Sequence, residues 1–146
     1  MIVRDIPRIT NQINNKKMNR EIKFRGLTNN GTWVYGNLIQ GKNGACYICS
    51  INENPVCKNG DYWYIDSPCY VVIPETVAQF TGLKDIEGKE IYEGDIILGY
   101  NNPHVVTFAD GAFYLTYKNS SVRLSRTCGA LKIIGNIYDN PELCPI

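Results

Sequence analysis

The stretch TGLKDIEGKEIYEGDI, from Thr81 to Ile96, decides the fold because it places two turns beside two short strand-like segments. Asp85–Gly88 has the pattern of a type I turn in which the glycine takes the left-handed conformation of a bulged hairpin. Lys89–Tyr92 then alternates like a strand, Glu93–Asp95 turns the chain again, and the apolar run IILGY comes next. The glycines therefore supply positive φ angles, and the stretch predicts consecutive antiparallel strands.

Similar turn signals divide the rest of the chain into short segments. They occur at Thr28–Gly31, Gly41–Gly44, Asn59–Gly60 and Asp110–Gly111. The flanking runs alternate between apolar and polar residues, and the ten Tyr, 13 Gly and seven Pro are typical of strands joined by turns. Residues 53–61 have the composition of a loop. The sequence therefore predicts a mainly β fold built from curled antiparallel sheets.

One short helix is predicted near residues 74–81. Pro74 has the fixed φ that suits the first helical position, Val77 and Phe80 share a helical face, and Gly82 marks the end. A helix of about two turns is not stable alone, so we expect it to lean against a sheet.

Two segments share a Gly-Asn pair between apolar residues, namely YGNLI at Tyr35–Ile39 and IGNIY at Ile134–Tyr138. Glycine inside a strand often marks a bulge or a bend. We expect both segments to be kinks at which a long strand passes from one sheet to another, which is a structural role.

Length and composition limit the class of protein. A chain of 146 residues with 44% hydrophobic and 20% charged residues fits one globular domain around one core. No apolar run approaches the roughly 20 residues that span a bilayer, and the basic first 20 residues lack the apolar centre of a secretory signal. The net charge of +1 argues weakly against DNA binding. We therefore expect a cytoplasmic protein that does not bind membranes.

The N-terminal segment, residues 1–17, differs in character from the remainder of the chain. It is rich in Asn and Lys and shows no sustained periodicity, whereas clean alternation begins shortly after Met18. Terminal segments of this composition are ordered only when something ties them down. Residues 1–17 are therefore either a mobile arm or an upstream extension, and the folded domain spans 18–146.

Cysteine is the most suggestive residue type for chemistry. The six cysteines are Cys46, Cys49, Cys57, Cys69, Cys128 and Cys144. Cys46 and Cys49 have the spacing of paired zinc ligands, and Cys57 with Cys69 would complete a set of four. However, ACYICSI has the pattern of a strand, in which residues three apart point to opposite faces. Because disulfides are also rare in a reducing cytoplasm, we expect free thiols rather than a zinc site or disulfides.

The other groups that could carry chemistry are few. His104 is the only histidine, and its position beside Pro103 predicts a strand end rather than a catalytic role. Glu90, Glu93 and Asp95 would have to converge to bind a cation, yet a strand makes Glu90 and Glu93 diverge. We expect these two glutamates, like Glu87, to face water. The sequence thus predicts no metal, no cofactor and no enzymatic activity.

Aromatic side chains give the best candidate binding residues: Trp33 and Tyr35 on one face of one strand, and Tyr62, Trp63 and Tyr64 in another. Small β domains bind single-stranded nucleic acid or proline-rich peptides by stacking on such side chains. The same residues also suit an aromatic core or a subunit interface. The sequence alone leaves both interpretations open.

Four segments, taken in order, resemble the YopX family of phage and prophage proteins: MNREIKFRG at Met18–Gly26, WVYGNLI at Trp33–Ile39, the long motif at Pro74–Ile97, and IIGNIYDNPEL at Ile133–Leu143. The resemblance spans about residues 18–143. It implies a mostly β fold with a small SH3-like barrel portion in the C-terminal half, assembly into homo-oligomers, and no established biochemical activity.

The resemblance also bears on the ends of the protein and on its role. The family usually begins at the methionine equivalent to Met18, which favours an extension over an arm for residues 1–17. We predict an uncharacterised, non-enzymatic phage or prophage accessory protein in a bacterial cytoplasm. It would self-associate and bind an unknown host or phage protein. The alternative is weak binding of single-stranded nucleic acid by the aromatic strands.

Overall fold

The structure is a computed structural model that describes residues 20–50, 56–65, 67–126 and 130–146. Side chains are described over the same ranges except 56–58 and 62–65. The segment 1–17 that the sequence sets apart lies outside the described residues. No helix in the described ranges is long and apolar enough to cross a membrane.

Short strands dominate the described chain, as the turn signals predict. The strands are β1 (Phe24–Leu27), β2 (Trp33–Gln40), β3 (Cys46–Cys49), β4 (Val56–Asn59), β5 (Tyr62–Ile65), β6 (Cys69–Val72), β7 (Ala78–Lys84), β8 (Glu90–Tyr92), β9 (Asp95–Gly99), β10 (Asn102–Ala109), β11 (Ala112–Tyr117), β12 (Ser120–Arg123) and β13 (Lys132–Asn136). Two 3₁₀ helices, η2 (Pro74–Thr76) and η3 (Pro141–Leu143), are also present among the described residues.

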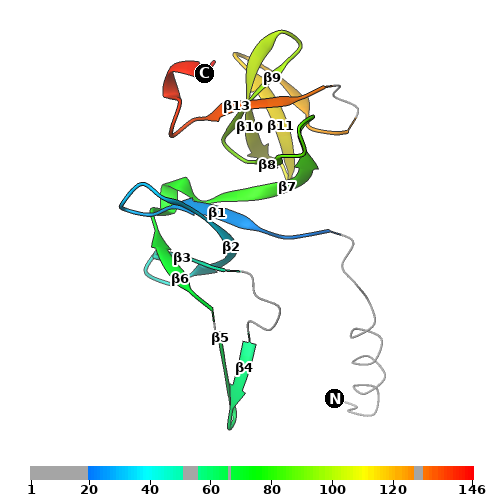
Figure 1. The fold of residues 1–146 in the computed structure, drawn as a ribbon. Coiled ribbons are helices and arrows are strands. Elements are labelled where there is room, and N and C mark those ends of the chain that lie inside the picture. Colours follow the sequence, from blue (N-terminus) through cyan, green and yellow to red (C-terminus); the bar gives the residue numbers. More distant parts are fainter. Residues whose placement is uncertain (1–19, 51–55, 66, 127–129) are drawn as a thin grey trace, which may run out of the picture.

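The strands form two main antiparallel sheets (Figure 1). The first sheet has the order β6-β3-β2-β1-β7-β8, and the second sheet has the order β12-β11-β10-β9-β13. Strand β7 runs from the first sheet toward the second. Strand β8, which pairs with β7, therefore belongs to the first sheet but lies close to the second. Among the described strands, β4 and β5 pair only with each other. This hairpin arm projects from the first sheet on the side away from the second.

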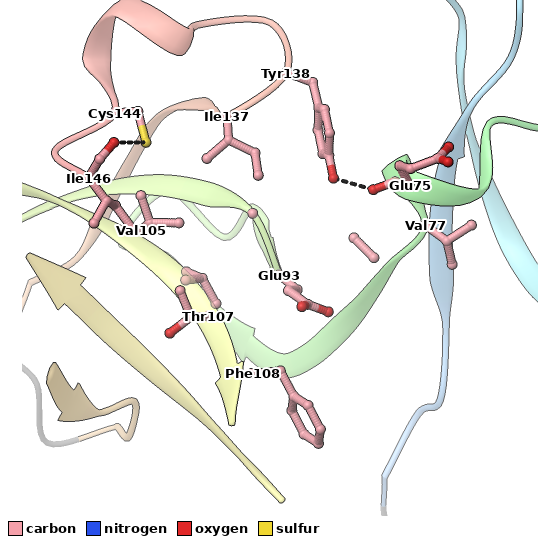
Figure 2. A pocket seen from close by; sticks show the side chains of 13 residues that line it. Glu75, Val77, Glu93, Val105, Thr107, Phe108, Ile137, Tyr138, Cys144 and Ile146 are labelled. Carbon is pink, nitrogen blue, oxygen red and sulfur yellow. Dashed lines mark hydrogen bonds between the residues drawn. The ribbon is translucent and has the colours of Figure 1, made fainter. Parts of the chain in front are cut away.

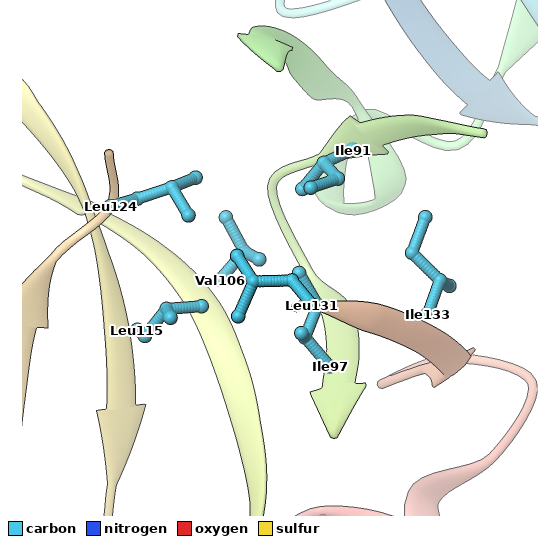
Figure 3. Packing of buried hydrophobic residues seen from close by; sticks show 7 residues of the cluster. All are labelled: Ile91, Ile97, Val106, Leu115, Leu124, Leu131 and Ile133. Atoms are coloured by element: carbon cyan, nitrogen blue, oxygen red, sulfur yellow. The ribbon is translucent and has the colours of Figure 1, made fainter. Parts of the chain in front are cut away.

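The larger core lies on the second sheet (Figure 3). Its buried members come from β8 to β13 and are Ile91, Ile97, Val106, Leu115, Leu124, Leu131 and Ile133. Each such aliphatic side chain contributes about 1.5–3 kcal/mol when it leaves water. Because Ile91 sits on β8, this core also anchors one strand of the first sheet.

The first sheet has a smaller core. Cys46, Ile48 and Val72 are buried there, with partly buried Phe24 and Leu38 packed against them. A third cluster of Ala78, Phe80 and Tyr92 lies on β7 and β8, the strands of the first sheet that come close to the second sheet. The main cluster of the first sheet therefore has fewer buried members than the core on the second sheet.

The predicted helix over 74–81 is wrong. The helical part is only the three-residue η2, and Val77 already has extended backbone angles before β7 begins. Ala78 and Phe80 are both buried, which is the two-residue period of a strand, and the Phe80 N–H donates to the Lys23 carbonyl. Over two turns the helical and strand patterns cannot be separated, and pairing with β1 decides the outcome.

The SH3-like barrel is not confirmed. The second sheet is open, with β12 and β13 at its edges, so the C-terminal half is a curled sheet rather than a closed barrel. The loop expected over 53–61 is also wrong in part, because β4 takes up residues 56–59. Residues 53–55 lie outside the described residues. The mainly β, antiparallel fold is confirmed.

The turn predictions hold in detail. Asp110 and Gly111 both have positive φ, +49° and +75°, and join β10 to β11. In the opening stretch, the Asp85 carboxylate accepts hydrogen bonds from the N–H groups of Glu87 and Lys89, each at 2.9 Å. Acids in this segment thus shape the turn, as the sequence predicts.

Both Gly-Asn segments contain a strand irregularity. At Gly36, β2 changes its pairing from β1 to β3, and a Cβ atom there would lie 2.0 Å from the Cys49 carbonyl oxygen. In β13 the register against β9 shifts between Ile133 and Gly135, which is a bulge. Each segment therefore has the expected irregularity, and at Gly36 only glycine leaves room for the neighbouring strand. The expected passage from one sheet to another is wrong, because β2 lies in the first sheet alone and β13 in the second alone.

Candidate functional site

Trp33 is held in place on three sides. Its indole N–H donates to Asp139 at 2.8 Å, and its ring lies 5.9 Å from the ring of Tyr138. The Arg25 guanidinium carbon lies 4.8 Å from the indole centroid. The C-terminal segment therefore fixes one edge of the tryptophan, and β1 supplies a cation to its face.

Arg25 joins the two sheets. It lies on β1, and its Nη2 is 2.7 Å from the carboxylate of Asp95 on β9, with both side chains almost fully buried. Its guanidinium also lies 4.9 Å from the Tyr92 ring. Burial raises the pKa of Asp95, while the charge of Arg25 and the Tyr92 N–H limit that rise. A buried pair of this kind is costly to break from one side.

Tyr35 lies beside Tyr92 on the side that faces solvent and is 49% exposed. Its ring contacts the Tyr92 ring edge-on at 5.5 Å. The Tyr92 hydroxyl donates to Glu90 at 2.8 Å, and the Lys23 ammonium lies 2.8 Å from the other Glu90 oxygen. Burial and the neighbouring Glu90 carboxylate raise the pKa of Tyr92.

The expectation that the three glutamates face water is correct only for Glu87, which is exposed. Glu90 is engaged by Lys23 and Tyr92, and Glu93 is half-buried. The sequence could not reveal this, because Lys23 precedes Glu90 by 67 positions. Among the described residues no group of three or more His, Cys, Asp or Glu side chains is placed to hold a metal ion.

An open recess of about 340 Å³ lies beside Trp33 and Tyr35. Tyr70 from β6 and Asn30 from the β1–β2 turn also line it. Its aromatic walls suit a flat or apolar group. The role of Trp33 and Tyr35 in binding stays a prediction.

Tyr62, Trp63 and Tyr64 lie on β5 of the hairpin arm. Their backbone positions pair with Asn59, Lys58 and Cys57 of β4. Their side chains lie outside the described residues, so nothing is concluded about which faces they cover. The fold places their strand in a sheet separate from that of Trp33 and Tyr35.

The expectation of free thiols is wrong for one pair of cysteines. Cys49 and Cys69 form a disulfide across the last pair of the β3–β6 ladder, with their Cα atoms 3.9 Å apart. Cys46 and Cys144 are free. The side chains of Cys57 and Cys128 lie outside the described residues. The zinc-like spacing suggested Cys46 as the partner of Cys49. The true partner is Cys69, because β3 and β6 pair with each other at the base of the hairpin arm.

His104 lies near the start of β10, as its place beside Pro103 predicts. The sequence did not predict that it is buried. Its Nδ1 lies 2.9 Å from the Asn102 carbonyl oxygen, and its ring packs between those of Tyr100 and Tyr117. These contacts are those of a core side chain.

A surface that the sequence did not indicate crosses the first sheet. Ile39, Tyr47 and Val71 lie opposite one another on β2, β3 and β6, and all three are exposed. We call these three residues the apolar stripe. Residues in direct register share a face, so the stripe is continuous and ends at the outer strand β6. The apolar run CYVVI carried a signal for this surface, but a run of that kind does not show which of its residues reach solvent.

Comparisons with known proteins agree with this fold. A family model described as YopX protein matches residues 23–144. The crystal structure of protein EF1440 from Enterococcus faecalis is similar, with a TM-score of 0.59 and 25% sequence identity, covering 85% of this chain and 98% of that chain. No curated protein matches the sequence. Since the family model covers most of the folded region, the chain belongs to the YopX family.

Proposed function

We propose that this chain is a non-enzymatic, phage- or prophage-encoded accessory protein that acts by binding protein, first of all a second copy of itself. The observation that carries the proposal is the outer edge of β6. This edge is where the first sheet can be continued by another chain.

The other outer strands of the two main sheets are protected by charge. Each of β8, β12 and β13 contains a charged residue, whereas β6, with the sequence CYVV, contains none. Tyr70 and Val71 on β6 are 45% and 57% exposed. Proteins that remain monomers usually place charge, proline or a bulge on such an edge. An uncharged apolar edge favours strand addition.

The apolar stripe reinforces the edge. If the β6 strands of two copies pair antiparallel about a two-fold axis, the two Val71 residues lie close together. The apolar stripes of the two copies then join into one continuous stripe. Ile39 and Tyr47 would extend the buried surface behind them. Backbone hydrogen bonds and apolar burial would then act at the same interface.

The hairpin arm supports the same proposal. An isolated two-stranded hairpin is marginally stable in water, and β4–β5 pairs with no third strand among those described. Its second strand carries the sequence YWYI and leads directly into β6. A partner that covers the arm would therefore also meet the edge.

The test is the mass in solution by sedimentation, compared between the native chain, Val71→Lys and Ile86→Lys. Ile86 is 61% exposed in the turn before β8, so its replacement changes the surface by the same chemistry away from the edge. We expect a multiple of 16.5 kDa for the native chain and for Ile86→Lys, and 16.5 kDa for Val71→Lys. A native monomer at high concentration would refute self-association, and an unchanged Val71→Lys oligomer would refute this edge.

Binding of single-stranded nucleic acid remains the second candidate, and the recess beside Trp33 and Tyr35 favours it. The cations near this recess, Lys23 and Arg25, are ion-paired with carboxylates and offer little free charge to phosphates. For this reason we favour a protein partner over nucleic acid. A fluorescence titration with a labelled single strand at low salt separates the two. A salt-dependent shift that Tyr35→Ala weakens would support nucleic acid.

A further inference from the structure

A pocket of about 480 Å³ lies between the two sheets (Figure 2). Its walls are largely apolar and come from distant parts of the chain, with Val77 before β7, Val105 and Phe108 on β10, and Ile137 after β13. The volume is in the range of small-molecule sites. This pocket is separate from the apolar stripe and shares no residue with it.

Glu93 is the less exposed of the two glutamates that line this pocket. Its backbone is fixed, since its N–H donates to the Gln79 carbonyl at 3.0 Å and its carbonyl accepts from Arg25 at 3.3 Å. In Figure 2 its side chain lies between Phe108 and Val77. Its carboxylate makes no hydrogen bond or ion pair with any described residue, although burial raises the pKa of this group.

The rest of the lining provides no compensating charge. Among the described residues that line the pocket there is no Lys, Arg or His, and the second ionisable carboxylate is Glu75 at the rim. The Tyr138 hydroxyl donates to the Glu75 carbonyl, and the Thr107 hydroxyl is bonded to Thr116. The polar groups that could satisfy Glu93 are therefore already engaged. A half-buried carboxylate without a partner costs stability unless a ligand supplies one.

We propose that this pocket binds an organic cation, namely an ammonium group on an apolar stem. The Glu93 carboxylate pairs with the ammonium, and Val77, Val105 and Ile137 cover the stem. Charge complementarity identifies the ligand class, because an anion would meet two carboxylates and a neutral apolar molecule would leave Glu93 unpaired. The ammonium can come from a free small amine or from a lysine side chain of another protein.

The experiment is a calorimetric titration with n-hexylamine and with hexan-1-ol, in phosphate buffer because Tris is itself a primary amine. The native chain is compared with Glu93→Gln and with Glu87→Gln, which removes an exposed carboxylate outside the pocket. We expect hexylamine to bind the native chain and Glu87→Gln equally, and to bind Glu93→Gln about tenfold more weakly or worse. Hexanol should bind the native chain more weakly than hexylamine by a similar factor.

Three results would overturn the proposal: no binding of hexylamine, equal binding of hexanol, or unchanged affinity in Glu93→Gln. A thermal melt of Glu93→Gln checks that the variant is folded, so that a loss of binding can be attributed to the carboxylate. We expect the fold to be intact, because the carboxylate that is lost has no partner. A further arm uses Nα-acetyl-lysine methylamide. Its binding at Glu93 identifies a protein side chain as the source of the ammonium, whereas binding of hexylamine alone identifies a free amine.

Discussion

The two sheets differ in their buried cores and in the character of their outer strands. The core on the second sheet has seven buried aliphatic members, one of which is Ile91 from β8 of the first sheet, and each outer strand of the second sheet carries a charged residue. The first sheet has three buried residues in its main cluster and three more on β7 and β8, together with an uncharged outer strand and a hairpin arm that no third described strand covers. One chain therefore combines a sheet whose two outer strands both carry charge with a sheet that has one uncharged outer strand and an uncovered arm. The difference indicates where partners would bind.

The largest effect we expect is at the joint between the sheets. Asp95→Asn leaves Arg25 buried without its counter-charge, which should lower the free energy of unfolding by about 3–5 kcal/mol. Equilibrium unfolding in urea measures this loss. Because Arg25 and Asp95 come from different sheets, the change should also weaken the coupling between them, so that probes in the two sheets no longer give one transition.

The matched control for that variant is Glu87→Gln. It removes one member of a surface pair with Lys132, in which the charges are 3.4 Å apart and both side chains are about half exposed or more. Surface pairs of this kind contribute at most about 1 kcal/mol. If Asp95→Asn were no more destabilising than Glu87→Gln, the buried pair would not be what joins the sheets.

The same contrast explains what the sequence could predict. Turns such as Asp110–Gly111 depend on the φ angles of two adjacent residues, so local pattern suffices for them. Burial of Asp95 depends on Arg25, which precedes it by 70 positions, and no local pattern carries that information. The helix near 74–81 failed for the same reason, because pairing with β1 outweighs the local preference.

The candidate site obeys this rule as well. The sequence placed Trp33 and Tyr35 on one face, and in the structure Arg25 lies over the Trp33 ring while Tyr35 contacts Tyr92. It could not place Glu93 in a pocket, since the walls come from segments that meet only in the folded chain.

The next largest effect concerns the disulfide at the base of the hairpin arm. Cys49 and Cys69 are separated by 20 positions, and closing a loop of that length stabilises the fold by about 3 kcal/mol in the chain-entropy model. We therefore expect a reductant to lower the midpoint of urea unfolding of the native chain. Hydrogen exchange should speed up in the arm and in the β3–β6 ladder, while the core of the second sheet stays protected.

A chain carrying Cys49→Ala and Cys69→Ala is the control, because its stability should not respond to reductant at all. An equal response in both chains would show that the reductant acts elsewhere. A native chain that is insensitive to reductant would mean that the first sheet does not depend on this link, contrary to the comparison between the sheets.

The smallest effect concerns pH and separates two acids of the stretch that decides the fold. Burial works against the charged form of Asp85, but hydrogen bonds from the N–H groups of Lys89, Ile133 and Glu87 outweigh it and lower the pKa. Burial alone raises the pKa of Glu93. Asp85 therefore stabilises the fold above its unfolded pKa, and this contribution is lost as the pH falls through its lowered folded value.

Glu93 has the opposite sign. Its charged form is disfavoured in the fold, so the native state takes up a proton before the unfolded state does, and stability rises as the pH falls through the raised pKa. Near neutral pH, Glu93→Gln should therefore be slightly more stable than the native chain, and the difference should vanish on acidification. The charged or ionisable groups around Glu93 are Tyr138, whose pKa is raised by burial, Arg25, which donates to the Glu93 carbonyl, and Glu75, which lines the same pocket. Measuring the difference in both the native and the Glu75→Gln background isolates Glu93, and a difference independent of pH would mean that its carboxylate has a partner after all.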